Sequence, residues 1–208
     1  CRGFGPNELD GGTVPNSMDN CPGDANTSQV DTDGDQKGDA CDACPMQPNP
    51  GAAVCPGTIY GVKTGASPLG QPVSLGNVLV TGVGPSGFFL QVEENESGYM
   101  GRPNSGVFAF KANSGLTVGD RISIPATTPS LFNGQIQLSG VPNLADGGTT
   151  VVSTGNTLPV PVVIADPADL ANNDGGLGAA LDGVLVRVNN PTVINNNPDA
   201  GPGDRASI

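Results

Sequence analysis

Five aspartates fall at short, regular intervals between residues 31 and 42. Ca²⁺ takes about six to eight oxygen ligands, and a short loop supplies them from positions 1, 3, 5, 7, 9 and 12, of which position 7 gives a backbone carbonyl. The flanking residues lack the helical pattern that usually accompanies this spacing. The spacing predicts a calcium site with the ligands Asp31, Asp33, Asp35, Lys37 (through its carbonyl), Asp39 and Asp42.

The charges of this loop favour a bound cation over a solvated linker. Two carboxylates about 4 Å apart repel by roughly 4 kcal/mol at an effective dielectric near 20, so five converging carboxylates would not stay folded alone. An acidic disordered linker is the alternative, but it gives no reason for Cys21 and Cys41 to bracket the loop. Magnesium is a weaker candidate because it rarely uses an all-protein cage. Zinc is weaker still, because the chain has no histidine.

The residues around the loop resemble a known family. The segment Asp19-Asn20-Cys21-Pro22 leads in, an Asn and a Gln follow, and Gly38-Asp39-Ala40-Cys41-Asp42 closes the loop. This pattern resembles the thrombospondin type-3 repeat, although Gln36 stands where glycine normally permits a sharp turn. The resemblance implies an irregular calcium-binding repeat, which we assign to residues 1–50. It also implies the disulfides Cys21–Cys41 and Cys44–Cys55, which leave Cys1 over.

An imperfect copy of the same loop pattern precedes the Asp-rich loop. Four side chains between residues 8 and 19 take positions 1, 3, 9 and 12, a fifth residue offers its carbonyl at position 7, and Gly12 stands where a carboxylate is expected. Asp24 or Asn26 could complete this site, and in the resembling repeats the residue at the position of Asn26 is a ligand. We therefore expect a second, weaker calcium site with the ligands Glu8, Asp10, Val14, Asn16, Asp19 and Asn26.

The composition of the first fifty residues explains why metal and disulfides are needed there. Residues 1–44 carry nine acidic and two basic residues, a balance of −7 out of −12 for the whole chain. They hold too few apolar side chains to bury a core, so cross-links must substitute for one. With only eight Lys and Arg residues in the chain, a nucleic-acid phosphate backbone is an unfavourable partner.

Beyond a proline-rich hinge, short apolar alternations separated by glycine and asparagine predict a mainly β architecture. We expect an antiparallel β-barrel over residues 51–145 and part of a second β unit over residues 146–208. The dipeptide Asn133-Gly134 predicts a tight hairpin turn, and Asp166-Pro167 predicts the start of a short helix at residues 168–171. The expected strands are residues 58–63, 73–83, 87–92, 106–111, 121–124, 135–138 and 184–188.

The order of several short phrases in this region carries a second resemblance. They run from Gly76-Asn77-Val78-Leu79-Val80 through Gly87-Phe88-Phe89-Leu90-Gln91 to Phe132-Asn133-Gly134-Gln135-Ile136. They are similar to the OB-fold-like domain attached to bacterial extracellular nucleases and surface proteins, over roughly residues 58–140. The resemblance implies a β-barrel of the OB type.

Candidates for catalysis are few, and we expect a non-catalytic chain. Without histidine, the usual general base and the Ser-His-Asp triad are missing. The acidic cluster Glu93, Glu94 and Glu96 fits a solvated loop. The phenylalanines lie mostly in strands, where we expect them to pack in the core, which leaves little for a stacking surface.

These features lead to two hypotheses about function. The first is an extracellular, calcium-binding structural module that mediates adhesion or assembly, with itself or other surface proteins as partner. The alternative is an accessory substrate-binding region of a secreted nuclease or other hydrolase. Five cysteines indicate an oxidising compartment, so we expect an extracellular or cell-surface location. Cys1 as first residue resembles the lipidated start of a bacterial lipoprotein. The alternatives are that the chain was trimmed at an arbitrary point or that Cys1 bonds to another subunit.

Overall fold

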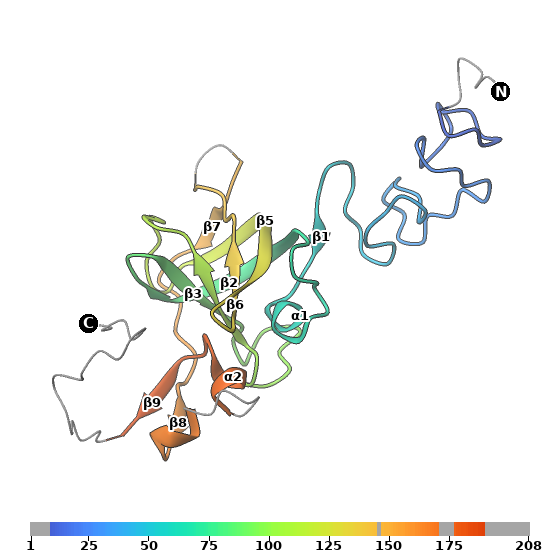
Figure 1. The fold of residues 1–208 in the computed structure, drawn as a ribbon. Helices are drawn as coiled ribbons and strands as arrows, with labels where there is room; N and C mark the ends of the chain where they lie inside the picture. The colour runs from blue at the N-terminus through green and yellow to red at the C-terminus, as the bar shows by residue number, and fades with distance from the viewer. Residues whose placement is uncertain (1–8, 145–146, 171–176, 190–208) are drawn as a thin grey trace.

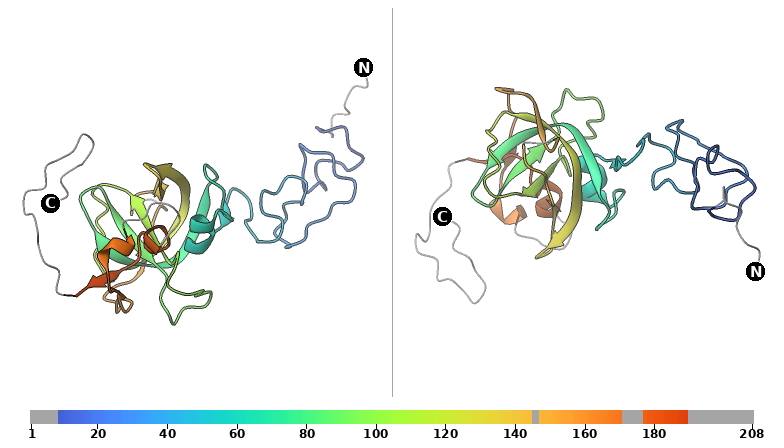
Figure 2. Two further views of the ribbon diagram at one scale, coloured as in Figure 1. Left: turned by 60° about the horizontal axis from the view of Figure 1, so that its bottom comes forward. Right: turned by 90° about the horizontal axis from the view of Figure 1, so that it is seen from above.

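The computed structural model describes residues 9–144, 147–170 and 177–189 and is mainly β. Its centre is a barrel of five strands: β2 (Val73–Val83), β3 (Gly87–Gln91), β4 (Gly106–Phe110), β5 (Arg121–Phe132) and β6 (Gln135–Ser139). The strands follow one another in the order β2-β3-β4-β6-β5, and β5 pairs back with β2, which closes the barrel (Figure 1). Seen from above, the strands form a ring (Figure 2). The predicted β-barrel is confirmed.

The pairing directions are those of an OB-like fold. The pair β4 and β6 is parallel, whereas the other neighbours in the barrel are antiparallel. The hairpin between β5 and β6 turns at Asn133 and Gly134, with φ of 50° and 82°. Two positive φ values are what a tight type I′ turn requires, so the predicted turn is confirmed.

A short helix covers one end of the barrel where we predicted a strand. Helix α1 (Ile59–Thr64) begins at Thr58, whose side-chain oxygen accepts a hydrogen bond from the Gly61 N–H, and ends at Gly65, which has φ of 84°. Its buried residues are Ile59, Tyr60 and Val62, which join the core of the barrel. The β-branched and aromatic residues suggested a strand, but the two caps and the packing against the barrel decide for a helix.

We expected the phenylalanines to pack in the core, but several of them lie on the surface. Phe88 is fully buried, but Phe89, Phe110 and Phe132 are 38%, 53% and 54% exposed. Side chains alternate between the two faces of a strand, and in β4 the inner face is taken by Val107 and Ala109. The aromatic rings on the outer face therefore cannot reach the core.

The N-terminal segment has a different architecture. Between residues 9 and 54 the structure contains neither helix nor strand, and the segment extends away from the barrel (Figure 1). The disulfides Cys21–Cys41 and Cys44–Cys55 are both present, as the resemblance implied. Cys55 then begins β1 (Cys55–Pro56), which pairs with the start of β2. The segment is thus joined to the barrel by a disulfide and a strand pairing.

The C-terminal part adds small elements to the barrel. Strand β7 (Thr150–Ser153) pairs with β5, and β8 (Val162–Ile164) pairs in parallel with β9 (Val186–Val188). A 3₁₀-helix η1 (Pro167–Leu170) takes the place of the helix predicted at 168–171, whose last residue lies outside the described part. Strand β9 begins two residues later than predicted, because the Val184 N–H donates to the Leu181 carbonyl at the end of α2 (Leu177–Leu181) and the Leu185 N–H donates to Gln91 Oε1. Val184 is buried in a cluster with Ile164 and Leu181. Among the described residues, none of the helices has the length and apolar character of a membrane span.

The barrel core predicts the effect of truncating its side chains. Leu90→Ala should lower the free energy of unfolding by about 2–5 kcal/mol, because Leu90 is fully buried and its truncation leaves a cavity. Leu131→Ala should change it by less than about 0.5 kcal/mol, since Leu131 is 60% exposed. Urea unfolding of both variants measures the difference. Equal destabilisation would contradict the assignment of the core.

Candidate metal centre

Three of the predicted ligands converge in the Asp-rich loop. One carboxylate oxygen from each of Asp31, Asp33 and Asp35 lies within 4.8 Å of the other two. The backbone of the loop folds around these side chains: Asp31 Oδ1 accepts from the Gly34 N–H at 2.8 Å, and its Oδ2 accepts from the Gln36 N–H at 2.9 Å. The loop therefore aims its first three aspartates at one point.

Two left-handed residues let the loop turn this sharply. Gly34 has φ of 77° and Gln36 has φ of 78°. A glutamine in this conformation is strained, because its Cβ crowds the neighbouring carbonyl. At position 6 of the loop, where glycine is usual, Gln36 adopts the same left-handed conformation. Glutamine in place of glycine therefore raises the conformational energy of the turn but leaves its geometry unchanged.

Some carboxylate oxygens of the loop have no partner. Among the described side chains, Asp33 Oδ2 and Asp42 Oδ2 are buried and lack a hydrogen-bond partner. Removal from solvent raises the pKa of Asp33, and the charges of Asp35, Asp42 and Asp31 raise it further. An unpartnered buried carboxylate oxygen is costly, and a cation would satisfy these oxygens. The oxygen-only donor set suits Ca²⁺.

Asn49, which we did not predict as a site residue, contacts the Asp-rich loop through its backbone. Its backbone N–H donates to Asp35 Oδ2 at 2.6 Å, and its carbonyl accepts from Lys37 Nζ at 2.9 Å. The side chain is 3% exposed, its amide donates to Ala53, and its Oδ1 has no partner. A sequence signal existed: the spacing Asp-x-Cys-Pro-x₃-Asn that joins Asp19 to Asn26 recurs from Asp42 to Asn49.

The other predicted ligands of this loop have different surroundings. Both carboxylate oxygens of Asp39 accept hydrogen bonds from Thr32, one from its N–H at 2.8 Å and one from its hydroxyl at 2.6 Å. The hydroxyl contact, with the N–H contact, lowers the pKa of Asp39. Lys37 lies in the loop and donates its N–H to Asp35 Oδ1. Asp39 thus closes the loop through Thr32, and the carboxylates that converge are those of Asp31, Asp33 and Asp35.

The structure describes five of the six ligands predicted for the upstream loop. Glu8 lies outside the described residues. Asp10 Oδ1 accepts from the Gly12 N–H, and its buried Oδ2 has no partner. Asn16 Oδ1 accepts from the Leu9 N–H at 3.1 Å. Val14, the predicted carbonyl donor, is half-buried in this loop.

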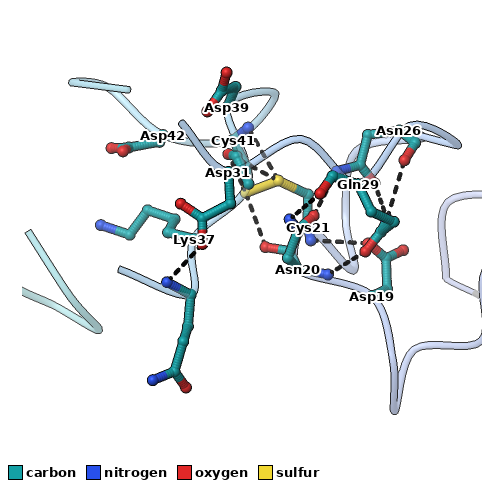
Figure 3. Close-up of a disulfide and its surroundings, with 12 residues drawn as sticks. Asp19, Asn20, Cys21, Asn26, Gln29, Asp31, Lys37, Asp39, Cys41 and Asp42 are labelled. Carbon is teal, nitrogen blue, oxygen red and sulfur yellow. Dashed lines mark hydrogen bonds between the residues drawn. A yellow bond between two sulfur atoms is a disulfide. The ribbon is translucent and has the colours of Figure 1, made fainter. Parts of the chain in front are cut away.

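Gln29 brings the end of the upstream loop together with Asn26 (Figure 3). Its Nε2 donates to Asp19 Oδ1 at 2.8 Å and to Asn26 Oδ1 at 2.6 Å, and its Oε1 accepts from the Asn20 N–H. Gln29 itself has a positive φ of 50°. Asp19 and Asn26 are therefore neighbours, as a shared ion would require.

A disulfide and a close backbone approach fix the two loops to each other. The Cys21–Cys41 bond lies beside Gly38, where an added Cβ would collide with Asn20 Oδ1 and Cys21 Sγ. The Gly38 N–H donates to the Asn20 carbonyl at 3.0 Å. Glycine is needed here because no side chain fits the contact. The disulfide stabilises this arrangement by roughly 3 kcal/mol on a chain-entropy estimate.

The acidic cluster of the barrel is a structural ion-pair network, not the free solvated loop that we expected. Arg121 is paired with Glu93 and with Glu96, the latter at 2.7 Å, and Arg102 is paired with Glu94 at 2.6 Å. Burial raises the pKa of Glu96. The two Arg121 pairs tie the loop after β3 to the start of β5, and the Arg102–Glu94 pair lies within that loop.

No protein-family model matches the chain, and no curated protein or solved structure is significantly similar to it. The resemblances to the thrombospondin type-3 repeat and to the OB-fold-like nuclease domain therefore rest on short motifs of the sequence. The molecule itself shows a closed β-barrel, two disulfides and a group of carboxylates that could hold a metal ion.

The unpartnered oxygen of Asn49 leads to a prediction. Asn49→Ala should weaken calcium binding by about tenfold, because it removes an oxygen next to the Asp-rich loop. Asn49→Asp should restore binding, since it keeps an oxygen at that place, and Gln47→Ala in the same disulfide loop should have no effect. Calorimetric titration of the four proteins with CaCl₂ measures this. Equal affinities for wild type and Asn49→Ala would exclude Asn49 as a ligand.

Proposed function

We propose that the N-terminal repeat binds Ca²⁺ and that the ion stiffens an extracellular structural module. The observation that carries the proposal is the convergence of Asp31, Asp33 and Asp35 beside buried carboxylate oxygens that lack a partner. The proposed ligands also include Asp42, Asn49 and the carbonyl of Lys37, with Asp39 closing the loop through Thr32. Bound calcium supplies positive charge and oxygen coordination at this point.

The proposed site has a mechanical consequence for the barrel. Asp35 accepts from the Asn49 N–H, and Asn49 lies between the two cysteines of the Cys44–Cys55 disulfide. Cys55 is the first residue of β1, which pairs with β2. Ordering of the loop is therefore transmitted along a covalent and hydrogen-bonded path to the barrel wall.

A second, weaker calcium site is part of the proposal. Its ligands are Glu8, Asp10, Val14, Asn16, Asp19 and Asn26. The contact of Gln29 with both Asp19 and Asn26 supports it, as does the unpartnered Oδ2 of Asp10. The weaker affinity follows from the smaller number of carboxylates in this loop.

The location and the class of activity follow from the same chemistry. Two disulfides favour an oxidising environment, so we place the protein outside the cell or on its surface. Cys1, the candidate lipid attachment point, lies outside the described residues. The proposed role is non-catalytic, in adhesion or assembly with itself or with other surface proteins.

One observation favours the second candidate function, an accessory substrate-binding region of a secreted hydrolase. Phe89 and Phe110 are exposed on the outer face of the barrel. Exposed aromatic rings on a rigid sheet are a common means of binding extended substrates. This candidate is compatible with calcium binding, because the rings lie on the barrel and the ions in the N-terminal repeat.

Calcium titration and limited proteolysis test the first candidate. Asp33→Ala should lower the affinity for Ca²⁺ by roughly tenfold or more, because affinity follows the number of charged ligands. It should also make residues 1–44 sensitive to protease in the presence of calcium. Glu94→Ala removes an equal charge from the barrel and should leave both properties unchanged. The measurements are calorimetry and mass spectrometry of the proteolytic fragments.

The outcomes against the proposal are specific. Identical proteolysis with calcium and with chelator would show that no ion orders the repeat. A structural role in assembly further predicts that calcium promotes association in sedimentation experiments and that chelator reverses it. A chain that stays monomeric and keeps its melting temperature when calcium is removed would contradict that role.

A further inference from the structure

Three phenylalanines gather on the outer face of the barrel. In β3 and β4, Phe89 is paired directly with Phe108, and Phe110 follows two residues further along β4. Side chains that are two apart in a strand, or opposite each other in adjacent strands, share a face. We call this group, Phe89, Phe108 and Phe110, the aromatic platform.

Glycines on the neighbouring strands seat the rings of the platform. Gly82 of β2 is paired with Phe89, and a Cβ at Gly82 would lie 3.2 Å from that ring. A Cβ at Gly87 would collide with the ring of Phe108. The rings of Phe89 and Phe108 have their centroids 5.1 Å apart and are tilted by 55°. The two rings therefore lie over bare backbone, in positions fixed before any ligand arrives.

Uncharged polar residues continue the platform across the barrel. Phe108 is paired with Gln137 of β6, and Gln137 is paired with Ser130 of β5. Strands β3, β4 and β6 contain no charged residue. The face thus combines aromatic rings with amide and hydroxyl groups, which can donate and accept hydrogen bonds without charge.

The C-terminal unit forms a wall beside the platform. Residues 183–186 line, together with Thr81, Gly82 and Phe89, a hollow of about 290 Å³. The wall is attached to the barrel: the Leu185 N–H donates to Gln91 Oε1 at 2.9 Å, and the carboxylate of Asp182 binds Lys63 and Gln135. The platform is therefore bounded on one side, which gives an extended ligand a defined track.

The charge of the protein decides which class of ligand fits. The chain carries a net charge of −12, Lys63, Arg102 and Arg121 are paired with carboxylates, and Lys111, the single cation next to Phe110 in the sequence, donates to the side chain of Asn143. A phosphodiester chain would find little to neutralise its charge. A neutral sugar chain presents apolar C–H faces to the rings and hydroxyl groups to the amides.

We propose that the aromatic platform binds a neutral polysaccharide. This inference rests on the second candidate function above and not on calcium. The ligand lies along Phe89, Phe108 and Phe110, with the wall of residues 183–186 on one side.

Native electrophoresis of the full chain in gels containing a soluble neutral polysaccharide tests the inference. The probes are a β-glucan, a glucomannan and an α-glucan, each compared with a gel without polysaccharide. We expect retardation by at least one of them. Phe89→Ala and Phe110→Ala should each weaken binding by about tenfold, since each removes one stacking ring. Leu131→Ala is the control and should bind like wild type, because Leu131 is an exposed apolar residue of β5 whose side chain lies on the opposite face of the strand from Ser130.

Four outcomes would overturn the inference. They are the absence of retardation by all three probes, an equal loss in Leu131→Ala, binding of a single-stranded oligonucleotide in place of the sugars, and a dimer that Phe110→Ala dissociates. Gels run with chelator separate the two proposals. Retardation that persists without calcium supports the platform even if the calcium titrations fail, and calcium binding without retardation leaves only the first candidate function.

Discussion

Repulsion among converging carboxylates is the interaction that the N-terminal segment must offset in order to stay folded. Asp31, Asp33 and Asp35 are held together by backbone hydrogen bonds within the loop, and the pKa of Asp33 is raised by burial and by its acidic neighbours. In the described residues before 55, Cys21 is the only buried hydrophobic side chain. Apolar burial therefore cannot offset this repulsion. The two disulfides and the hydrogen bonds of the loop stabilise the segment, and the calcium ion that we propose would offset the repulsion.

The same constraint explains how the two architectures are connected. Without a core, residues 9–54 cannot pack against the barrel through a broad apolar interface. Asn49 instead contacts the Asp-rich loop with both its N–H and its carbonyl, and the Cys44–Cys55 disulfide joins the segment that contains it to β1. A few directional bonds of this kind, with the disulfide, therefore connect the Asp-rich loop to β1. Their stiffness depends on the order of the loop to which they are attached.

The sequence predicted the features that depend on local chemistry. The Asn133-Gly134 turn needs only two positive φ values, and the spacing of the first three aspartates is a property of the loop itself. Features that depend on tertiary contacts were missed. Helix α1 forms because the barrel buries its apolar side, and Asn49 contacts the Asp-rich loop from a separate disulfide loop.

The outward phenylalanines show a further limit of sequence-based prediction. An aromatic residue in a strand suggests a core position, but alternation fixes only that Phe88 and Phe89 point to opposite faces. Which face is the interior follows from barrel closure, which places Phe88 inside with Val107 and Ala109. The barrel therefore has a complete core without its outer rings. Gly82 has no side chain, which leaves room for the ring of Phe89 on the outer surface. Because stability does not require these rings to be buried, the outer face is available for binding.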